Sequence, residues 1–312
     1  MAVAGGGLAG LTAALFAARC GRSTVVLSSV PGGPLLSVTR IEDFPGFPDG
    51  VAGYELVPLV QDQALAAGAV FEMAELEGLE PADNGWSLAT GAGELRAGAV
   101  IVATGSTPRE LGVPGEERLT GHGISHCASC DGPLYRDRVV GIVGGGDSAL
   151  QGALELAEHV REVIVFHRGT AFSAQETYRQ RVLESSRITV RYQTVVEEIL
   201  GEETVAGVRA QDLATGGIAD IELAGLFVYI GTVPRTELLR DLLPLDDRGR
   251  VPTDGRMRTE LPGLLAAGDV RSESAAQAVA VAGDGATAAL AAHGYLAGGS
   301  WRAASSEEAA RR

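Results

Sequence analysis

Short apolar runs lead into glycine-rich turns and then into helix-length apolar stretches along much of the chain. The first such block has an apolar run at 1–4, a glycine turn and an alanine-rich stretch that ends at Arg19, and a second apolar run follows at 24–27. A strand, a tight turn, a helix and a second strand make the βαβ unit of a parallel sheet. The same order returns at 139–166. The pattern therefore predicts an α/β protein with two doubly wound domains.

Further segments extend this pattern. A buried strand runs into a glycine turn at 98–106, another ends in Gly-Asp at 264–270, and a long alanine-rich helix is expected at 275–292. Residues 186–230 alternate short apolar runs with turns, which indicates an antiparallel layer on the second domain. The length of 312 residues agrees with two domains, because a domain typically has about 100–200 residues.

The first glycine turn has the spacing of a dinucleotide-binding loop. Gly5, Gly7 and Gly10 occupy the three positions of G-x-G-x-x-G between a strand and a helix. In such a loop the first glycine makes the turn, the second lets a pyrophosphate approach the backbone, and the third packs the helix against the strand. The acidic residue that holds a ribose hydroxyl at the end of the second strand is missing, and Ser28 and Ser29 stand there. A plain turn is the alternative interpretation of this segment alone.

A second loop of the same kind follows about 140 residues later. Gly144, Gly146 and Ala149 occupy the G-x-G-x-x-A positions, with Ser148 in the same turn. Two loops predict two Rossmann-like dinucleotide-binding domains, one for a flavin dinucleotide and one for a nicotinamide dinucleotide. Asp269, at the carboxyl end of a predicted strand, is well placed to accept a hydrogen bond from a ligand hydroxyl.

Cys127 and Cys130 lie between the two loops and are separated by two residues. Thiols at this spacing can form a disulfide, and a thiolate of the pair can attack a partner disulfide through a mixed disulfide. Asp131 follows, where a carboxyl group can pass a proton to a departing thiolate; its alternative role is to cap a helix or turn. Half a zinc site and two unreactive buried thiols are the other interpretations. Since Cys20 is the only other cysteine, we predict a redox pair and no metal site.

Composition excludes several kinds of partner. The net charge is −15, and so acidic a surface repels the phosphates of nucleic acids and anionic lipids. No apolar run approaches the roughly 20 residues of a membrane span, and we expect no signal peptide. Three cysteines with one close pair favour a cytoplasmic location.

In this order of motifs the sequence resembles the low-molecular-weight thioredoxin reductases. Besides the two loops, the shared segments are 31–33, 41–47, 103–105, 127–132, 231–234, 267–270 and 277–285, so the resemblance covers nearly the whole chain. It implies an FAD-binding domain split between 1–108 and 239–312, and an inserted NAD(P)-type domain at 109–238 that carries the cysteine pair. It also implies a homodimer in which electrons pass from reduced flavin to the disulfide and then to thioredoxin or a similar protein.

The resemblance also implies roles for individual residues. One cysteine attacks the substrate disulfide, the other contacts the flavin, and Asp131 donates a proton. The further residues implied in cofactor binding are Gly32, Gly33, Asp43, Thr104, Gly105, Arg168, Gly268, Asp269, Gln277 and Ala278. Two positions depart from the family near the flavin, because Pro34 replaces a glutamine and Ala276 an arginine.

The inserted domain departs from the pattern of relatives that use NADPH. Those relatives have His-Arg-Arg and a further arginine four residues later, which bind the 2′-phosphate. Here His167 and Arg168 are followed by Gly169, and Ser173 stands at the last position. Losing two charge-assisted hydrogen bonds would weaken 2′-phosphate binding by about 3–6 kcal/mol. NADH is therefore a more suitable donor than NADPH.

Other activities stay open at this point. Ferredoxin is an alternative electron donor, and some relatives are oxidases that pass electrons from a small-molecule dithiol to oxygen. A flavoprotein sensor without catalysis is a third class, although a sensor has no need of the cysteine pair.

The segment from 297 onward runs past the usual end of the family. One interpretation is a frayed, charged terminus. The other is that Trp301 folds back over the flavin ring and blocks the face that a nicotinamide uses.

Overall fold

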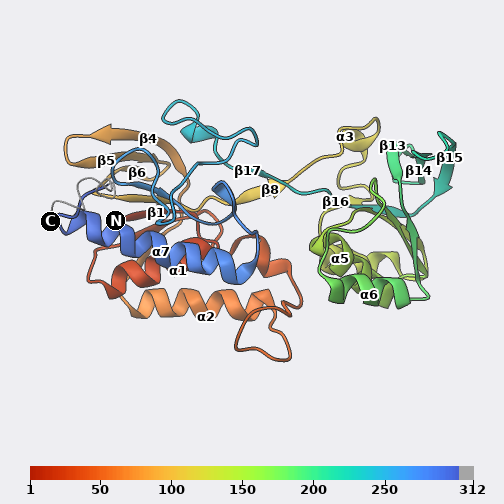
Figure 1. The fold of residues 1–312 in the computed structure, drawn as a ribbon, viewed down its shortest axis with the longest axis horizontal. Coiled ribbons are helices and arrows are strands. Elements are labelled where there is room, and N and C mark those ends of the chain that lie inside the picture. The colour runs from red at the N-terminus through yellow and green to blue at the C-terminus, as the bar shows by residue number, and fades with distance from the viewer. Residues whose placement is uncertain (302–312) are drawn as a thin grey trace, which may run out of the picture. The chain divides into compact units, whose positions relative to one another are not determined.

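The computed structural model describes residues 1–301, which fold into two compact units (Figure 1). Unit 1 comprises Met1–Thr107 and the chain from Val233 onward, and unit 2 comprises Pro108–Thr232. The chain passes between the units twice, through β8 (Ser106–Pro108) and β17 (Thr232–Pro234), which pair with each other. The second boundary thus precedes the expected one at 238/239. The segment after it is tied to unit 1, since the backbone N–H of Arg235 donates to the carbonyl of Gly105.

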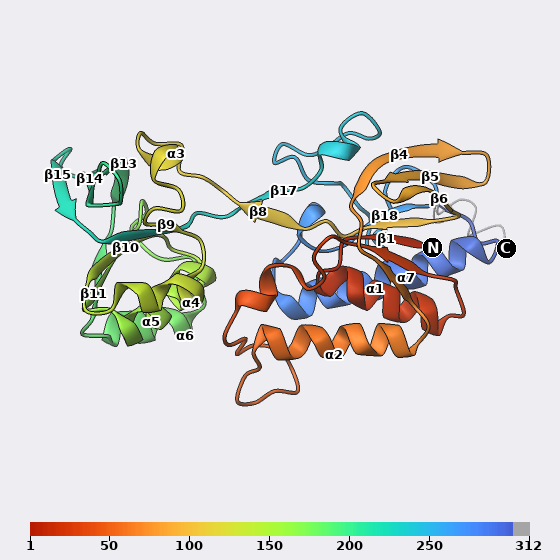
Figure 2. The ribbon, with the colours of Figure 1, turned by 180° about the vertical axis from the view of Figure 1, so that it is seen from behind.

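Unit 1 is built on a five-stranded parallel sheet in the order β18-β7-β1-β2-β3. Its strands are β1 (Ala2–Ala4), β2 (Val25–Leu27), β3 (Val70–Glu72), β7 (Val100–Val102) and β18 (Leu264–Ala266). Three helices lie along one face of the sheet (Figure 2), namely α1 (Leu8–Arg19), α2 (Gly53–Ala66) and α7 (Ala278–Leu296). An antiparallel sheet of β4 (Leu76–Ala82), β5 (Gly85–Thr90) and β6 (Gly93–Ala97) covers the other face.

Successive residues of these short strands point to opposite faces, so one strand contributes to two core clusters. Val3, Ile101 and Leu265 pack against the alanines of α1 and α7. Their neighbours in the strands pack against Trp86 and Leu88 of the antiparallel sheet. Because α1 and α7 consist mostly of small residues, their backbones approach closely. The loop that follows β1 is therefore held rigidly between the sheet and two helices.

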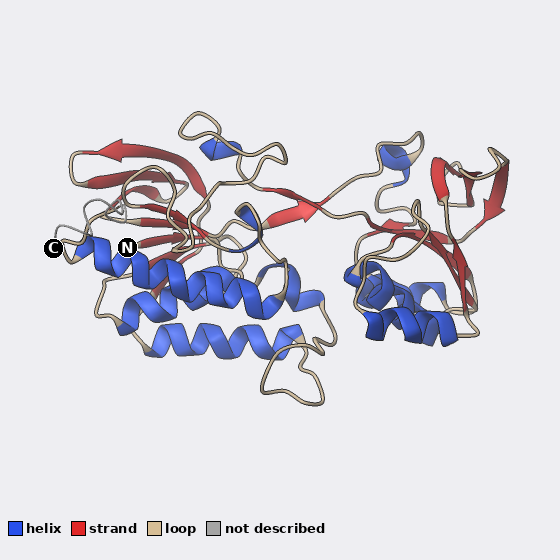
Figure 3. Cartoon of the chain, viewed as in Figure 1, coloured by secondary structure: helices blue, strands red, loops and turns tan. Residues whose placement is uncertain are grey.

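Unit 2 repeats this architecture. Its parallel sheet has the order β12-β11-β10-β16-β9, and its strands are β9 (Ile124–Ser125), β10 (Val139–Gly144), β11 (Glu162–Phe166), β12 (Ile188–Arg191) and β16 (Gly225–Tyr229). Three helices lie on one side of this sheet, namely α4 (Ala128–Asp131), α5 (Asp147–His159) and α6 (Glu176–Glu184). Figure 3 shows helices gathered on that side and another helix of the unit, α3 (Glu116–Leu119), apart from them. The antiparallel strands β13 (Thr194–Leu200), β14 (Gly207–Asp212) and β15 (Ile218–Glu222) pack on the other side, together with α3.

The predicted fold class is confirmed, with some corrections in detail. The antiparallel layer expected over 186–230 is limited to β13, β14 and β15, because β12 and β16 at the two ends of that range join the parallel sheet instead. The helix expected at 275–292 is α7, Ala278–Leu296. Within residues 1–301, no helix has the length and apolar character needed to cross a bilayer.

Candidate functional site

The first glycine loop connects β1 to α1 through tightly packed backbone. Gly5 has a φ of +115°, and a Cβ atom there would lie 2.2 Å from the carbonyl oxygen of Ala103. A Cβ at Gly10 would lie 1.9 Å from the carbonyl oxygen of Gly5. At Gly7, by contrast, nothing lies within 4 Å of an added Cβ, and Gly7 begins α1 without a side-chain cap. The loop thus leaves an open approach to the first amides of α1, which suits a pyrophosphate.

A second glycine turn lies directly against this loop. The N–H of Gly32 donates to the carbonyl of Gly6 at 2.7 Å. A Cβ at Gly33 would lie 3.5 Å from the Cα of Gly7. Pro34 follows as one of the first residues of the 3-10 helix η1 (Gly33–Ser37). The open side of Gly7 is therefore bordered by backbone rather than by side chains.

Residues after β7 and β18 meet at the same edge of the sheet. Thr104, next to the first loop, donates its hydroxyl to a backbone carbonyl at 2.7 Å, and Gly105 has a φ of +70°. The carboxylate of Asp269 accepts hydrogen bonds from the hydroxyls of Ser106 and Ser274, each at 3.4 Å. The structure thus brings Thr104, Gly105 and Asp269 to the carboxyl edge of the parallel strands, where open α/β sheets bind ligands.

The start of α7 lies beside the same loop. Gln277 is the N-cap of α7, and Ala278 packs in an apolar cluster with Leu8 of α1 and Ile41. Asp43 is exposed two residues after Ile41. Gln277 and Ala278 therefore join the group around the first loop, and Asp43 lies in the loop next to it.

Ala276, just before α7, has an unusual backbone conformation. Its φ is +51°, in the left-handed region that residues other than glycine rarely adopt. Its N–H donates to the hydroxyl of Ser274 at 3.2 Å. The turn before α7 is thus held through Ser274, whose hydroxyl also contacts Asp269.

The end of β2 lacks an acidic residue, but a carboxylate from a neighbouring segment stands beside it. The hydroxyl of Ser29 donates to Glu75 at 2.5 Å, and the N–H of Ser28 donates to the carbonyl of Glu72 at 3.2 Å. Glu75 follows β3, the strand next to β2 in the sheet. The sequence motif did not reveal this residue, because the motif describes only the strand in which the acid usually occurs.

The second glycine loop connects β10 to α5. Gly144 has a φ of +153°, and a Cβ there would lie 2.3 Å from the carbonyl oxygen of Tyr229 and 2.8 Å from the Cβ of Ala149. Gly146 begins α5 without a side-chain cap, and Ser148 is exposed in the first turn of this helix. This loop, like the first, leads into a helix whose first amides receive no side-chain cap.

The residues after β11 border the second loop. Ser173 donates both its N–H and its hydroxyl to the carbonyl of Gly145, at 2.9 and 3.2 Å. The ring of His167 is held by the carbonyl of Ala171 at 2.9 Å, and Arg168 is exposed. Position 173, which takes the last of the three arginines in the pattern described above, is thus occupied by a hydroxyl that hydrogen-bonds the loop itself.

Cys127 and Cys130 form a disulfide across the one-turn helix α4. Cys127 is the N-cap of this helix, and its sulfur accepts the N–H of Cys130 at 3.2 Å and lies 3.4 Å from the hydroxyl of Ser129. The interpretation as two unreactive buried thiols is wrong, because the sulfurs are bonded and Cys130 is exposed. Donors aimed at a cysteine sulfur favour its thiolate. The turn is therefore suited to thiol–disulfide exchange.

Asp131 ends α4, one residue after the disulfide. Asp131 is the N-cap residue of the following 3-10 helix, η2 (Gly132–Tyr135), by position, but its side chain makes no cap hydrogen bond to it. Burial and the charge of Asp131 raise the pKa of Tyr135. Burial raises the pKa of Tyr229 to about 12. Both tyrosines thus adjoin the disulfide turn as neutral phenols, and sequence reasoning singled out neither.

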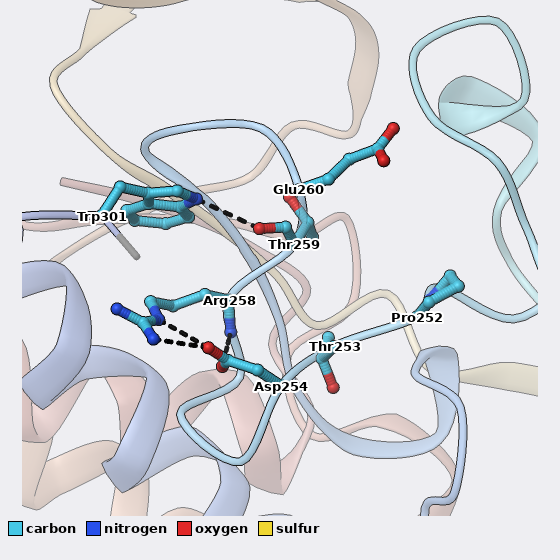
Figure 4. A pocket seen from close by; sticks show the side chains of 7 residues that line it. All are labelled: Pro252, Thr253, Asp254, Arg258, Thr259, Glu260 and Trp301. Carbon is cyan, nitrogen blue, oxygen red and sulfur yellow. Dashed lines mark hydrogen bonds and ion pairs between the residues drawn. The ribbon is translucent and has the colours of Figure 1, made fainter. Parts of the chain in front are cut away.

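Trp301 lies at the opposite end of α7 from Gln277. With 19 residues, α7 separates its two ends by about 28 Å. The indole N–H donates to the carbonyl of Thr259 at 3.1 Å, and the ring packs on Tyr295 with the centroids 4.9 Å apart. Trp301, Arg258 and Asp254 line a shallow cavity of about 310 Å³, and Figure 4 shows their side chains. The interpretation of Trp301 as part of a frayed terminus is therefore wrong, and within this chain Trp301 lies away from the first glycine loop. The rest of the tail, 302–312, lies outside the described residues.

Comparison with known proteins agrees with this geometry. The model of the pyridine nucleotide-disulphide oxidoreductase family matches residues 1–286. The thioredoxin reductases of Treponema pallidum and Mycolicibacterium smegmatis are 37% and 39% identical to this chain, over 94% and 95% of it and 96% of each relative. The crystal structure of Lactococcus lactis thioredoxin reductase is similar with a TM-score of 0.93 and 33% identity, and the match covers 95% of this chain and 98% of that one. The chain therefore belongs to the pyridine nucleotide-disulphide oxidoreductase family and, within it, to the flavin-dependent thioredoxin reductases.

Proposed function

We propose that this chain reduces the disulfide of thioredoxin or a thioredoxin-like protein, with electrons that reach the Cys127–Cys130 pair through FAD. The observation that carries this proposal is the disulfide across α4, which lies in the same unit as the second dinucleotide loop. The relatives that are 37% and 39% identical are named thioredoxin reductases, which supports a protein disulfide as the substrate.

We assign FAD to unit 1. The open approach at Gly7 and the free first turn of α1 suit the pyrophosphate. Asp269 and Glu75 offer carboxylates for the ribityl and ribose hydroxyls, and Gln277 begins the helix beside the loop. When bound, FAD takes a hydride from a nicotinamide and supplies two electrons to a disulfide.

The residues of unit 2 carry out the exchange. Reduction breaks the Cys127–Cys130 bond and, with two electrons and two protons, leaves two thiols. The Cys127 thiol passes its proton to Asp131, and its thiolate attacks one sulfur of the substrate disulfide, while the sulfur that departs takes that proton from Asp131. Cys130 then attacks Cys127 in the mixed disulfide, and the second substrate sulfur departs with the proton of the Cys130 thiol. This step restores the original pair and releases the substrate as a dithiol.

Cys127 is the attacking thiol in this proposal because hydrogen-bond donors converge on its sulfur. The N–H of Cys130 and the hydroxyl of Ser129 both lie within hydrogen-bond distance of it. Such donors stabilise a thiolate more than a thiol. Cys130 is then the sulfur that exchanges electrons with the flavin.

NADH is the proposed donor, bound at the second loop. Gly144 and Gly146 retain the backbone conformation that a dinucleotide needs. Arg168 is the one cation at the three positions where NADPH users have arginines, and Ser173 is engaged with the loop backbone. Without the arginines at positions 169 and 173, a 2′-phosphate is held about 3–6 kcal/mol less firmly.

Anaerobic bleaching of the flavin absorbance tests the donor. The FAD-loaded protein is mixed in turn with NADH, NADPH, reduced ferredoxin and a small-molecule dithiol, and then with oxidised thioredoxin. Bleaching by NADH, followed by reduction of thioredoxin, is expected. Bleaching only by ferredoxin, or bleaching by the dithiol with fast recovery in air, would replace the proposed activity by one of the alternatives. A C127S/C130S variant that still reduces thioredoxin would contradict the role of the pair.

We further propose a homodimer in the cytoplasm. The apolar side chains of Tyr54, Leu59 and Leu65 are exposed on α2, and such residues favour burial against a second copy. A redox pair that must cycle between disulfide and dithiol works in a reducing compartment. Light scattering of the FAD-loaded protein should give the mass of two chains.

A further inference from the structure

The last two residues of β16 hold both chain neighbours of Cys127. The carbonyl of Val228 accepts a hydrogen bond from the ring Nδ1 of His126 at 2.9 Å. The hydroxyl of Tyr229 accepts the N–H of Ala128, the first residue of α4, at 2.8 Å. β16 also pairs with β9, which ends two residues before Cys127. The end of β16 thus fixes the position of Cys127 through hydrogen bonds to the residues on either side of it.

Tyr229 fits its place closely. A Cβ at Gly152 of α5 would lie 3.1 Å from the ring of Tyr229 and 3.4 Å from the Cβ of Ala128. The absence of a side chain at Gly152 therefore leaves room for the ring of Tyr229 between α5 and the start of α4. The backbone of Tyr229 pairs with Gly144 in the sheet, so this residue borders the second glycine loop with its main chain and the disulfide turn with its side chain.

We propose that Tyr229 is a positioning residue for the Cys127 thiolate, because its hydroxyl fixes the start of α4 and so keeps the Cys127 sulfur aligned with the Cys130 N–H after the disulfide is reduced. In the disulfide state the S–S bond itself holds the turn. After reduction that constraint is gone, and the hydrogen bond from Ala128 to Tyr229 becomes a side-chain anchor of the first turn. The hydroxyl of Ser125, which accepts the N–H of Cys127 at 3.0 Å, holds the residue that precedes this turn. This role rests on the proposed function, in which Cys127 is the attacking thiol.

The anchor stays in one protonation state while the thiols titrate. Burial is the main cause that raises the pKa of Tyr229 to about 12, far above the ordinary thiol value of about 8.5. The other titratable groups around the turn are Asp131 of α4, Tyr135 of η2, Glu155 and His159 of α5, and His126 beside Cys127. Y229F and G152A leave all of them unchanged, and the control described below replaces only Tyr135, so a shift in the thiol titration reports on the anchor.

The test measures the reactivity of Cys127 against pH. In the FAD-loaded full chain carrying C130A, the rate at which iodoacetamide alkylates Cys127 is followed from about pH 5 to about pH 10, with peptide mass spectrometry separating Cys127 from Cys20. Adding Y229F should move the midpoint for Cys127 upward by about 0.5–1 pH unit, which corresponds to alkylation about three- to tenfold slower at neutral pH. The profile of Cys20 should stay the same.

Y135F is the matched control, because it removes a phenol hydroxyl beside Asp131 and leaves the hydrogen bond from Ala128 intact. G152A is a second probe: it keeps the hydroxyl of Tyr229 but presses on its ring, and it should shift the midpoint in the same direction. Profiles of Y229F and G152A that both coincide with that of Y135F would show that Tyr229 only fills space. Because neither donor nor protein substrate is present, failure of thioredoxin reduction leaves this titration readable. A Cys127 that in the parent titrates at or above about 8.5 would instead contradict its role as the attacking thiol.

Discussion

Arg271 and Asp284 form a bidentate ion pair next to the loop that carries Asp269. The guanidinium donates to the two carboxylate oxygens at 2.6 and 2.8 Å, and the side chains are 15% and 8% exposed. The same carboxylate accepts the N–H of Gly268 at 3.1 Å. Since Asp284 belongs to α7, the pair fastens the loop after β18 to the helix whose first residues adjoin the first glycine loop.

Removing one partner of this pair should destabilise unit 1. In R271M the carboxylate of Asp284 stays buried without its cation, and such a change costs about 3–5 kcal/mol. We expect a loss of this size in the free energy of unfolding, measured by urea titration of the FAD-loaded protein, together with weaker retention of FAD on dilution. R179Q is the control, since Arg179 pairs with Glu176 on the surface and should cost less than about 1 kcal/mol. Equal losses in the two variants would contradict a special role for the buried pair.

Glu75 should contribute to FAD binding in place of the missing acid after β2. E75Q keeps the shape of the side chain and removes its charge, so the dissociation constant for FAD should rise about tenfold, as expected for one hydrogen bond to a charged group. The quenching of FAD fluorescence on titration into apoprotein measures this constant. E77Q is matched in chemistry, because Glu77 is exposed in the adjoining strand β4. An unchanged constant for E75Q would remove Glu75 from the site.

The choice between NADH and NADPH should respond to charge at position 173. S173R places a second cation near Arg168 and gives up the hydrogen bond to the carbonyl of Gly145. One regained charge-assisted bond is worth about 1.5–3 kcal/mol, so the ratio of kcat/KM for NADPH to that for NADH should rise about tenfold to a hundredfold. G169R/S173R should raise it further, although a side chain at 169 must displace the ring of His167, 2.8 Å from an added Cβ. A ratio that stays constant in both variants would place the 2′-phosphate elsewhere.

Tyr229 makes the stability of unit 2 depend on pH in the alkaline range. Burial raises its pKa from 10.0 to about 12, so the folded protein keeps a proton that the unfolded chain has lost between these values. The protonated Tyr229 therefore gives its full stabilisation of the folded state below about pH 10. As the pH rises toward 12, the free energy of unfolding falls by about 2–3 kcal/mol. Guanidinium titrations from about pH 9 to about pH 12 measure it. Y229F should flatten this slope, and the slope should survive in Y135F for the most part.

Trp301 should matter for stability and not for the flavin. W301A removes a ring that is 9% exposed and packs on Tyr295, so we expect a loss of about 3–5 kcal/mol. The absorbance of bound FAD and its rate of reduction by NADH should stay as they are, because α7 separates Trp301 from the first loop. A changed flavin spectrum with unchanged stability would revive the idea that this side chain covers the ring.

The glycine loops could be located from the sequence because their spacing reflects local backbone geometry. Gly5 and Gly144 both lie where a Cβ would collide with a backbone carbonyl. Such a collision requires glycine at a fixed position, so it can be recognised within the few residues of one motif. The cysteine pair was equally local, since the disulfide spans three positions.

Contacts between distant segments could not be predicted in the same way. Tyr229 reaches Ala128 across 101 residues, and Ser29 reaches Glu75 across 46. Both contacts depend on the order of strands in a sheet, which the apolar pattern leaves undetermined. The packing of Trp301 could not be predicted for a related reason, because its partners, the buried Thr259 and the partly buried Tyr295, have no signature in the sequence of the tail.

Unit 2 is one uninterrupted stretch of chain whose two ends meet, with the N–H of Arg109 bonded to the carbonyl of Gly231 at 3.0 Å. A gene segment for this stretch could be exchanged between related proteins by two nearby crossovers without cutting any strand of either parallel sheet. Cys127, Cys130, Tyr229 and the second glycine loop would then be inherited together, while unit 1 would evolve separately. Donor preference and thiol reactivity can therefore evolve as linked traits.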